Sequence, residues 1–376
     1  MKTLKNLNLY TTDGIIKNGH ITFADQIISI GTGEVEGIDM KGRLLIPGFI
    51  DQHIHGVAGA DVMDASAKAL AMLKHELPKE GTTAFLATTM TEEDEAILAA
   101  CNTVDRFLND GDQHGAELLG IHLEGPFISP VYKGAQREDA IINPSVERFN
   151  AYQEAAGGHI RHVTMAPERP GADQLLAHLV KTNVTVSIGH SDADDKTVES
   201  ALARGAGCFT HGYNAMSRIH HRNLGVAGMM LLDDLAYAEI IPDLIHTNAQ
   251  AIRLLYKTKT ADKMIIVTDA MRAKGLADGR YALGGQDVTV SQGEARLADG
   301  TLAGSVLKMI DGVKHVKNVT GCAIEDLIKM ASLNPARLHG ITDRKGQIKV
   351  GLDADFLIVD EDLNLYETWC KGVRCA

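Results

Sequence analysis

The stretch "LLIPGFIDQHIHG" (residues 44–56) is an apolar run that ends in two histidines one residue apart. Side chains alternate between the faces of a strand, so His53 and His55 point the same way. Two imidazoles on one face can reach a common cation, but most His-x-His pairs are solvated loop residues. The pair alone leaves both interpretations open, and the rest of the chain has to decide between them.

Seven further apolar stretches follow, and most are separated by segments of helical period such as residues 64–81 and 194–206. Together these eight predicted strands and the intervening helices indicate βα units, and hence an α/β fold of the (β/α)8 TIM-type barrel. A doubly wound open sheet is the alternative, but its usual Gly-rich phosphate turn after the first strand is not present. The seven strands are expected at residues 82–89, 118–126, 160–168, 184–192, 207–215, 237–246 and 263–271.

The two ends of the chain have a different pattern of apolar and turn residues. Residues 14–31 and 345–372 alternate short apolar runs with Gly, Asn and Asp turns, which is typical of antiparallel strands. Since termini often lie close together, we expect residues 1–46 and 345–376 to form one small β-sandwich domain, with the barrel spanning residues 47–344. Residues 275–305 predict a β-hairpin excursion between the last barrel strand and its helix.

The net charge of the chain excludes some classes of binding partner. The 376 residues carry a net charge of -12, which argues against nucleic acid or an anionic membrane as a general partner. The five cysteines lack CxxC spacing, the first 14 residues lack a signal-peptide h-region, and no apolar run is long enough to span a bilayer. The sequence therefore predicts a cytoplasmic protein.

Polar side chains stand at the carboxyl ends of five predicted strands, where a barrel would gather them into one mouth. Any one of them alone would be a satisfied polar residue at a strand end. Six imidazoles and carboxylates at one rim predict instead a site for a divalent ion such as zinc or iron. The six are His53, His55, Glu124, His190, His211 and Asp269.

These residues lie in motifs that resemble the N-acetylglucosamine-6-phosphate deacetylases of the amidohydrolase superfamily. The motifs are "PGFIDQHIHG" (47–56), "HLEGPFISP" (122–130), "IGHSDA" (188–193), "THGYNAMS" (210–217), "VTDAM" (267–271) and "LAGS" (302–305). The resemblance implies one metal held by Glu124, His190 and His211. It also implies a second ion at His53 and His55, with Glu124 bridging, so that one or two ions are bound. Zinc or iron is the expected metal, with manganese and cobalt as further candidates.

The resemblance further implies hydrolysis of N-acetylglucosamine 6-phosphate to glucosamine 6-phosphate and acetate. A bound ion makes hydroxide available at neutral pH, and Asp269 accepts the water proton and returns it to the leaving amine. No "GxSxG" elbow is present, so an acyl-enzyme route is not expected. Arg222 matches an arginine that binds phosphate, often of the neighbouring subunit, which implies a homodimer. The residues that match the amino-sugar pocket are Ala135, Gln136, Asn214, Ala215, His246 and Leu302.

Two departures bear on the substrate. This chain reads "RNLG" (222–225) where many relatives read "REPG", and Gln136 stands where many carry a histidine that helps to polarise the carbonyl. A deacetylase for N-acetylgalactosamine 6-phosphate therefore stays open as an alternative. A cyclic-amide hydrolase usually carries a bridging lysine on the fourth strand, but here that strand ends in "MAPE" (165–168). A non-catalytic barrel would be expected to have lost ligands, and none is missing.

Overall fold

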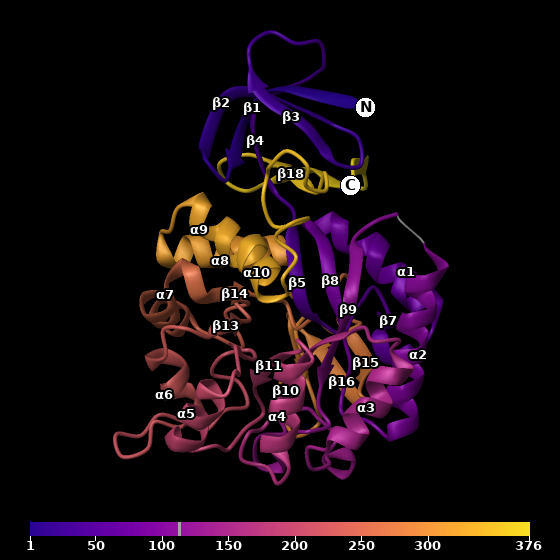
Figure 1. Ribbon diagram of the computed structural model, residues 1–376, viewed down its shortest axis with the longest axis vertical. Coiled ribbons are helices and arrows are strands. Elements are labelled where there is room, and N and C mark those ends of the chain that lie inside the picture. Colours follow the sequence, from indigo (N-terminus) through magenta and orange to yellow (C-terminus); the bar gives the residue numbers. More distant parts are fainter. Residues whose placement is uncertain (112–113) are drawn as a thin grey trace.

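The structure is a computed structural model that describes residues 1–111 and 114–376. Its larger part is a barrel of eight parallel strands, which pair in chain order (Figure 1). A bridge between Ile54 and Ala270 links the first strand to the segment after the last, so the barrel is nearly closed. The predicted TIM-type barrel is confirmed. Its strands are β5 (Phe49–Ile54), β8 (Thr82–Thr88), β9 (Glu117–Glu124), β10 (Ile160–Met165), β11 (Thr185–Ile188), β12 (Cys208–Phe209), β13 (Tyr237–Ile240) and β14 (Met264–Ile266).

Helices surround this barrel, and several begin where a side-chain oxygen caps the first turn. Ser66, Ser145 and Asp194 each accept a hydrogen bond from the backbone N–H three residues further on. Among the described residues no helix is both long and apolar enough to cross a membrane. The helices are α1 (Ala67–Glu76), α2 (Asp94–Asp110), α3 (Val146–Ala155), α4 (Ala172–Lys181), α5 (Asp195–Ala203), α6 (Gly225–Leu232), α7 (Ala249–Lys263), α8 (Met309–Thr320), α9 (Ile324–Ile328) and α10 (Asn334–Leu338), with one π-helical segment at Lys329–Leu333 and short 3-10 turns at Val62–Asp64, Leu77–Glu80, Pro130–Tyr132 and Glu138–Ala140.

Both ends of the chain meet in a second, smaller sheet, and the two termini lie in this part of the molecule (Figure 1). Its seven strands pair in the order β20-β19-β18-β4-β1-β2-β3. Leu4, Phe23, Phe356 and Trp369 share one core, so the sheet folds over its own apolar face. The strands are β1 (Lys2–Thr11), β2 (Gly14–Phe23), β3 (Ile27–Thr32), β4 (Ile38–Pro47), β18 (Phe356–Val359), β19 (Leu365–Cys370) and β20 (Val373–Arg374).

The chain passes from the small sheet to the barrel at Gly48. Strand β4 ends at Pro47 and β5 begins at Phe49, so the stretch expected as one strand is two strands of different sheets. A Cβ at Gly48 would lie 2.2 Å from Oγ1 of Thr83, and only glycine allows the two strands to approach this closely.

The predicted excursion after β14 is present as a three-stranded antiparallel sheet. It consists of β15 (Gly279–Leu283), β16 (Gln286–Ser291) and β17 (Glu294–Arg296). Gln286 Nε2 donates to the carbonyl of Ala135 at 2.5 Å, which ties the excursion to the loop after β9. A smaller hairpin, β6 (Gly56–Val57) and β7 (Ala60–Asp61), follows β5.

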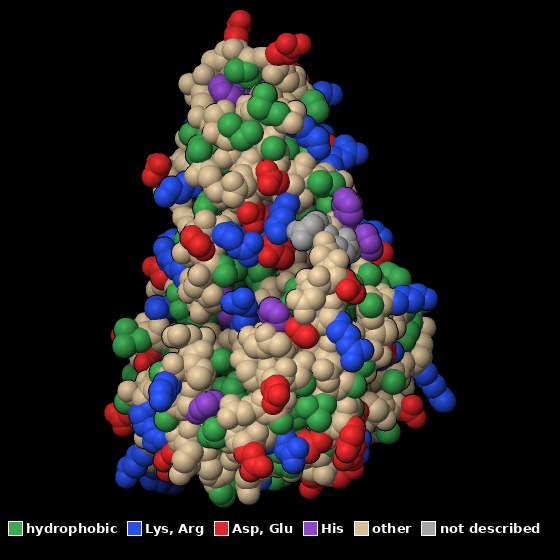
Figure 2. Space-filling model, turned by 45° about the vertical axis from the view of Figure 1, so that its right-hand side comes forward, with side chains coloured by type: hydrophobic (Ala, Val, Ile, Leu, Met, Phe, Trp, Pro, Cys, Tyr) green, Lys and Arg blue, Asp and Glu red, His purple; other side chains and the backbone are tan. Residues whose placement is uncertain are grey.

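An ion-pair network joins the amino end of the barrel to the small sheet. Glu117, the first residue of β9, lies 2.9 Å from Arg344 and Lys345 and 3.1 Å from Lys371. Asp353 lies 3.1 Å from the ammonium of Lys345, which also pairs with Asp355. Figure 2 shows acidic and basic side chains together at the waist between the two parts.

Candidate active site

The polar residues predicted at the strand ends converge at the carboxyl end of the barrel. Glu124 is the last residue of β9, and His190, His211 and Asp269 follow β11, β12 and β14 within three residues. These last three have φ values of 47°, 32° and 47°, in the left-handed region that non-glycine residues rarely adopt. Backbone strain of this kind costs of order 1–3 kcal/mol per residue and is concentrated at functional sites.

Glu124, His190 and His211 form one compact group. Glu124 Oε1 lies 3.2 Å from His190 Nε2 and 3.1 Å from His211 Nε2, and the two imidazole nitrogens are 3.0 Å apart. Ligands about 2.0–2.1 Å from one ion in a tetrahedron lie about 3.3 Å from one another. The three ligand atoms therefore have the spacing of neighbouring ligands on a single divalent ion.

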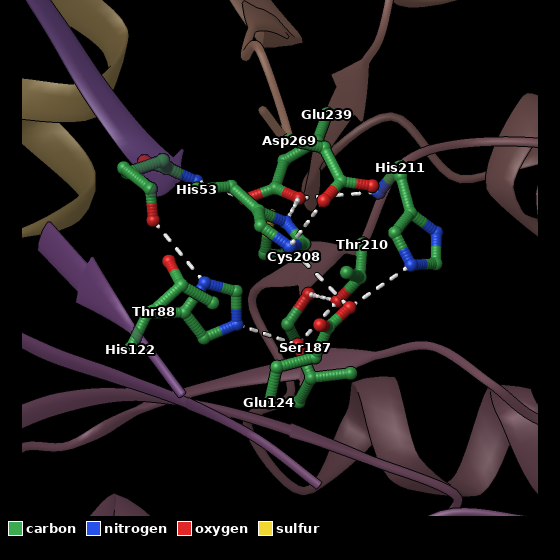
Figure 3. Close-up of polar contacts among 12 residues, drawn as sticks. His53, Thr88, His122, Glu124, Ser187, Cys208, Thr210, His211, Glu239 and Asp269 are labelled. Carbon is green, nitrogen blue, oxygen red and sulfur yellow. Dashed lines mark hydrogen bonds and ion pairs between the residues drawn. The ribbon is translucent and has the colours of Figure 1, made fainter. Parts of the chain in front are cut away.

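His53, His55 and Asp269 form a second group beside Glu124. His55 Nε2 lies 3.1 Å from Asp269 Oδ1 and 3.2 Å from Glu124 Oε2, while His53 Nε2 lies 3.3 Å from Glu124 Oε1. One carboxylate thus faces both groups, and all of these side chains are buried. Figure 3 shows His53, Asp269, Glu124 and His211 directed toward the same space.

Hydrogen bonds behind His190 and His55 fix which of their ring nitrogens faces Glu124. His190 Nδ1 lies 2.9 Å from the carbonyl of Tyr132, and His55 Nδ1 lies 3.2 Å from that of Thr88. A carbonyl only accepts, so each Nδ1 carries the hydrogen, and in neutral imidazoles each Nε2 presents a lone pair. His53 Nε2 is buried and has no hydrogen-bond partner among the described residues. Lone pairs that face carboxylate oxygens in a buried site fit a bound cation.

The electrostatics of the site also favour positive charge. Burial lowers the pKa of His55, but hydrogen bonds to Asp269 and Glu124 outweigh it and raise that pKa to about 9. His53 behaves in the same way: burial opposes its charged form, yet Glu124, Asp269 and Glu239 raise its pKa well above the ordinary value. Burial would raise the pKa of Asp269, but facing His53 and His55 lowers it, so this carboxylate stays ionised. The clustered carboxylates therefore attract a cation, whether protons or a metal.

A cavity of about 430 Å³ opens over these groups. Gln136 lies in its wall with its amide orientation fixed: Oε1 accepts from the backbone N–H of Thr91 at 2.7 Å, and Nε2 donates to Glu124 Oε2 at 2.9 Å. The amide N–H₂ therefore points at the metal groups. The predicted residues that line this cavity are His55, Glu124, Ala135, Gln136, His190, His211, Asn214, Ala215, His246, Asp269 and Leu302.

The structure does not bring Arg222 to the cavity of its own chain. It lies on an exposed turn before α6, where its guanidinium is 2.9 Å from the imidazole of His221. The excursion instead contributes Arg296, the one Lys or Arg among the described residues that line the cavity. Arg296 was missed because residues 275–305 were predicted only as a β-hairpin excursion, with no side chain assigned to the cavity.

Glu239 was also missed. It lies within β13 and accepts from His53 Nδ1 at 3.1 Å. The signal was present in the sequence, because a charged residue inside the apolar run "YAEII" (237–241) is rarely buried without a specific partner.

Comparison with known proteins agrees with this geometry. The model of the amidohydrolase family matches residues 44–375, so the chain belongs to the amidohydrolase family. These proteins are metal-dependent, in keeping with the ligand groups described above.

Within that family the chain groups with the N-acetylglucosamine-6-phosphate deacetylases. It is 44% identical to the one from Bacillus subtilis (strain 168), over 98% of this chain and 96% of that protein. It is 34% identical to an N-acetylgalactosamine-6-phosphate deacetylase of Escherichia coli O157:H7, over 98% of each chain. A variant of the Mycobacterium smegmatis deacetylase, solved with N-acetyl-D-glucosamine-6-phosphate, matches with a TM-score of 0.94 and 28% identity, over 100% of this chain and 99% of that one.

Proposed function

We propose that the protein hydrolyses N-acetylglucosamine 6-phosphate to glucosamine 6-phosphate and acetate. The observation that carries the proposal is the pair of ligand groups that share Glu124 at the base of one cavity. Relatives that bear this activity in their names and match nearly the whole chain support the same reaction.

Two ions are proposed, one at Glu124, His190 and His211 and the other at His53 and His55 with Glu124 shared. Imidazole and carboxylate ligands favour zinc or iron, and manganese or cobalt suit the same donor set. When bound, such an ion lowers the pKa of a water and polarises a carbonyl as a Lewis acid.

The residues around the ligands have separable roles in this proposal. Asp269 opens onto the cavity as an ionised carboxylate, so it accepts the proton of the attacking water and returns it to the amine that leaves. The amide of Gln136 points at the ligand groups and donates a hydrogen bond to the carbonyl oxygen as negative charge develops there. His246, held by Asp243 at 2.6 Å, orients the sugar in the cavity together with Asn214.

The phosphate site is proposed to include Arg222 of a neighbouring subunit, because this arginine is exposed and lies away from the cavity of its own chain. The protein would then act as a homodimer. We further propose the domain limits 1–46 with 345–376 and 47–344, and a cytoplasmic location.

Acetate release from purified protein tests the reaction. N-acetylglucosamine 6-phosphate should be turned over faster than its galactosamine epimer, since identity to the glucosamine enzyme is the higher of the two. An equal or faster rate on the epimer would support the alternative substrate instead.

Replacing Asp269 with Asn tests the proton-transfer role. General acid–base catalysis contributes about 10²–10⁴-fold, so kcat for acetate release should fall by that factor. Asp105→Asn, on the outer helix α2, serves as control and should retain full turnover. Unimpaired turnover in Asp269→Asn would remove the assignment of the base.

A further inference from the structure

Glu239 is a charged residue in the interior of the barrel, and its side chain is fully buried. A buried carboxylate is strongly destabilising unless hydrogen-bond donors surround it. Three donors surround it: Gln52 Nε2 lies 2.7 Å from Oε1, while His53 Nδ1 and the backbone N of His211 each lie 3.1 Å from Oε2. Figure 3 shows Glu239 beside both histidines, one from each ligand group.

This contact determines the tautomer of His53. The backbone N–H of His211 can only donate, so Glu239 Oε2 acts as an acceptor, and the hydrogen of the His53 contact resides on Nδ1. When His53 is neutral, its lone pair therefore resides on Nε2. That atom faces Glu124 Oε1 at 3.3 Å and Asp269 Oδ1 at 3.5 Å, and it is buried with no hydrogen-bond partner among the described residues.

A chain of hydrogen bonds from deeper in the barrel holds Glu239 in this orientation. Gln52 must donate its amide N–H to the carboxylate, so its Oε1 faces the other way and accepts from His339 Nε2 at 3.1 Å. The backbone carbonyl of Gln52 accepts from His122 Nδ1 at 3.2 Å. The two side-chain contacts fix the orientation of the Gln52 amide, and this amide holds one oxygen of Glu239.

His53 differs from the other ligands in what stands behind it. Neutral backbone carbonyls hold Nδ1 of His55 and His190, whereas a carboxylate holds Nδ1 of His53. A carboxylate behind a ligating histidine orients the ring and makes its other nitrogen a stronger donor, and loss of such a partner typically lowers metal affinity by about 10–100-fold.

We propose that Glu239 is a positioning residue for the second metal ion: it fixes the Nδ1–H tautomer of His53 and thereby equips the His53–His55 group to bind. The inference rests on the metal-dependent reaction proposed above and deepens it, because it names the residue that separates a two-ion site from a one-ion site.

Zinc titration of metal-free protein, with metal content measured by mass spectrometry, tests this directly. Wild type should bind two ions, and Glu239→Gln should weaken the second by about 10–100-fold while retaining the first. Glu117→Gln is the matched control, since it removes a mostly buried carboxylate at the opposite end of the barrel and should leave both affinities unchanged.

A double variant separates action through His53 from a general structural effect. In a His53→Gln background, Glu239→Gln should cause no further loss of zinc affinity. If it weakens the remaining ion there, Glu239 acts through the backbone of His211 and the proposal is overturned. Two ions bound by Glu239→Gln with wild-type affinity, or a single ion bound by wild type, would overturn it equally.

A second substitution covers a failure of Glu239→Gln to fold. Glu239→Asp keeps the charge but withdraws the oxygens from His53 by one methylene, so it should also weaken the second ion, and unchanged binding would contradict the proposal. Acetate release by wild type is measured on the same samples. Its absence would count against the proposed reaction and would leave the metal titration to decide the role of Glu239.

Discussion

Strand β9 carries a glutamate at each end, and the two carboxylates have opposite surroundings. Glu117, at the amino end, is within 3.1 Å of Lys345, Arg344 and Lys371, so the chain supplies the neutralising charge itself. Glu124, at the carboxyl end, pairs with four imidazoles and, among the described residues, with no lysine or arginine. At the amino end of the barrel the chain's own cations neutralise the carboxylate, whereas the arrangement at the carboxyl end suits a bound cation.

Backbone geometry around the two carboxylates differs as well. Three residues of the mouth, His190, His211 and Asp269, have positive φ values. Of the three residues paired with Glu117, only Lys371 does. In barrels of this type the carboxyl face carries the chemistry and the amino face contributes stability. Strain is tolerated at the mouth because the rest of the fold compensates for it.

Glu124→Gln should produce the largest effect. It removes the carboxylate that both ligand groups share, so metal content should fall and acetate release should fall with it. Metal ions contribute several kcal/mol to catalysis, and each 1.36 kcal/mol is tenfold in rate, so the loss should exceed about 100-fold. Metal analysis and kcat measured on the same sample check this.

Glu117→Gln is the matched variant for that experiment, because it makes the same substitution on the same strand. It should retain full metal content and turnover per folded molecule. Wild-type activity in Glu124→Gln, or lost metal in Glu117→Gln, would erase the difference between the two ends.

The next effect is on stability. Glu117→Gln removes one of the carboxylates that pair with Lys345 and Arg344, so the free energy of unfolding should fall by about 1–3 kcal/mol. Urea unfolding of metal-free protein measures it. Glu76→Gln, in an exposed pair with Lys79 on the surface, should cost less than about 1 kcal/mol.

The pH dependence of the same variant sharpens the test. Burial would raise the pKa of Glu117, but Lys345, Arg344 and Lys371 outweigh it and lower that pKa from 4.5 to about 2. Because the folded pKa lies below the unfolded one, the stabilisation is complete above about pH 4.5 and disappears as the pH falls toward about 2. The difference between wild type and Glu117→Gln should therefore shrink over this window. A difference that stays constant would show that the charge of Glu117 is not what stabilises.

The smallest effect is expected at the rim of the mouth. Arg296 is half-exposed and paired with Glu294 at 2.7 Å, so a contact with a sugar phosphate would be worth about 1 kcal/mol at most. Arg296→Met should raise KM by about 5-fold at most. The value of kcat should change little, because the lost contact would stabilise the bound substrate and the transition state equally. Arg280→Met, on the exposed side of β15, is the control. An unchanged KM would leave the phosphate to Arg222 of a partner subunit.

The sequence predicted the barrel because apolar runs alternate with segments of helical period along its centre. Each of the eight predicted stretches overlaps one barrel strand. It could not divide residues 44–56, since Leu45 and Phe49 are equally apolar and equally buried although they belong to different sheets. Hydrophobic periodicity indicates that a residue is buried, but it does not indicate which sheet the residue belongs to.

The ligands were predictable because each stands at the end of an apolar run. Glu239 and Arg296 were not predictable in this way. Glu239 lies inside an apolar run and Arg296 on a short strand of the excursion, so neither stands at the carboxyl end of a predicted barrel strand. Arg222 illustrates a different limit, because a role in a neighbouring subunit cannot be read from the fold of one chain.

The small sheet has a consequence for biosynthesis. Strand β4 pairs with β18, and about 300 residues separate them in the chain. At about 5–20 residues per second, the ribosome needs roughly 15–60 s to deliver the missing neighbour. Throughout that interval the nascent polypeptide displays an unpaired apolar edge, so assembly of the barrel has to run ahead of completion of the sheet that encloses both termini.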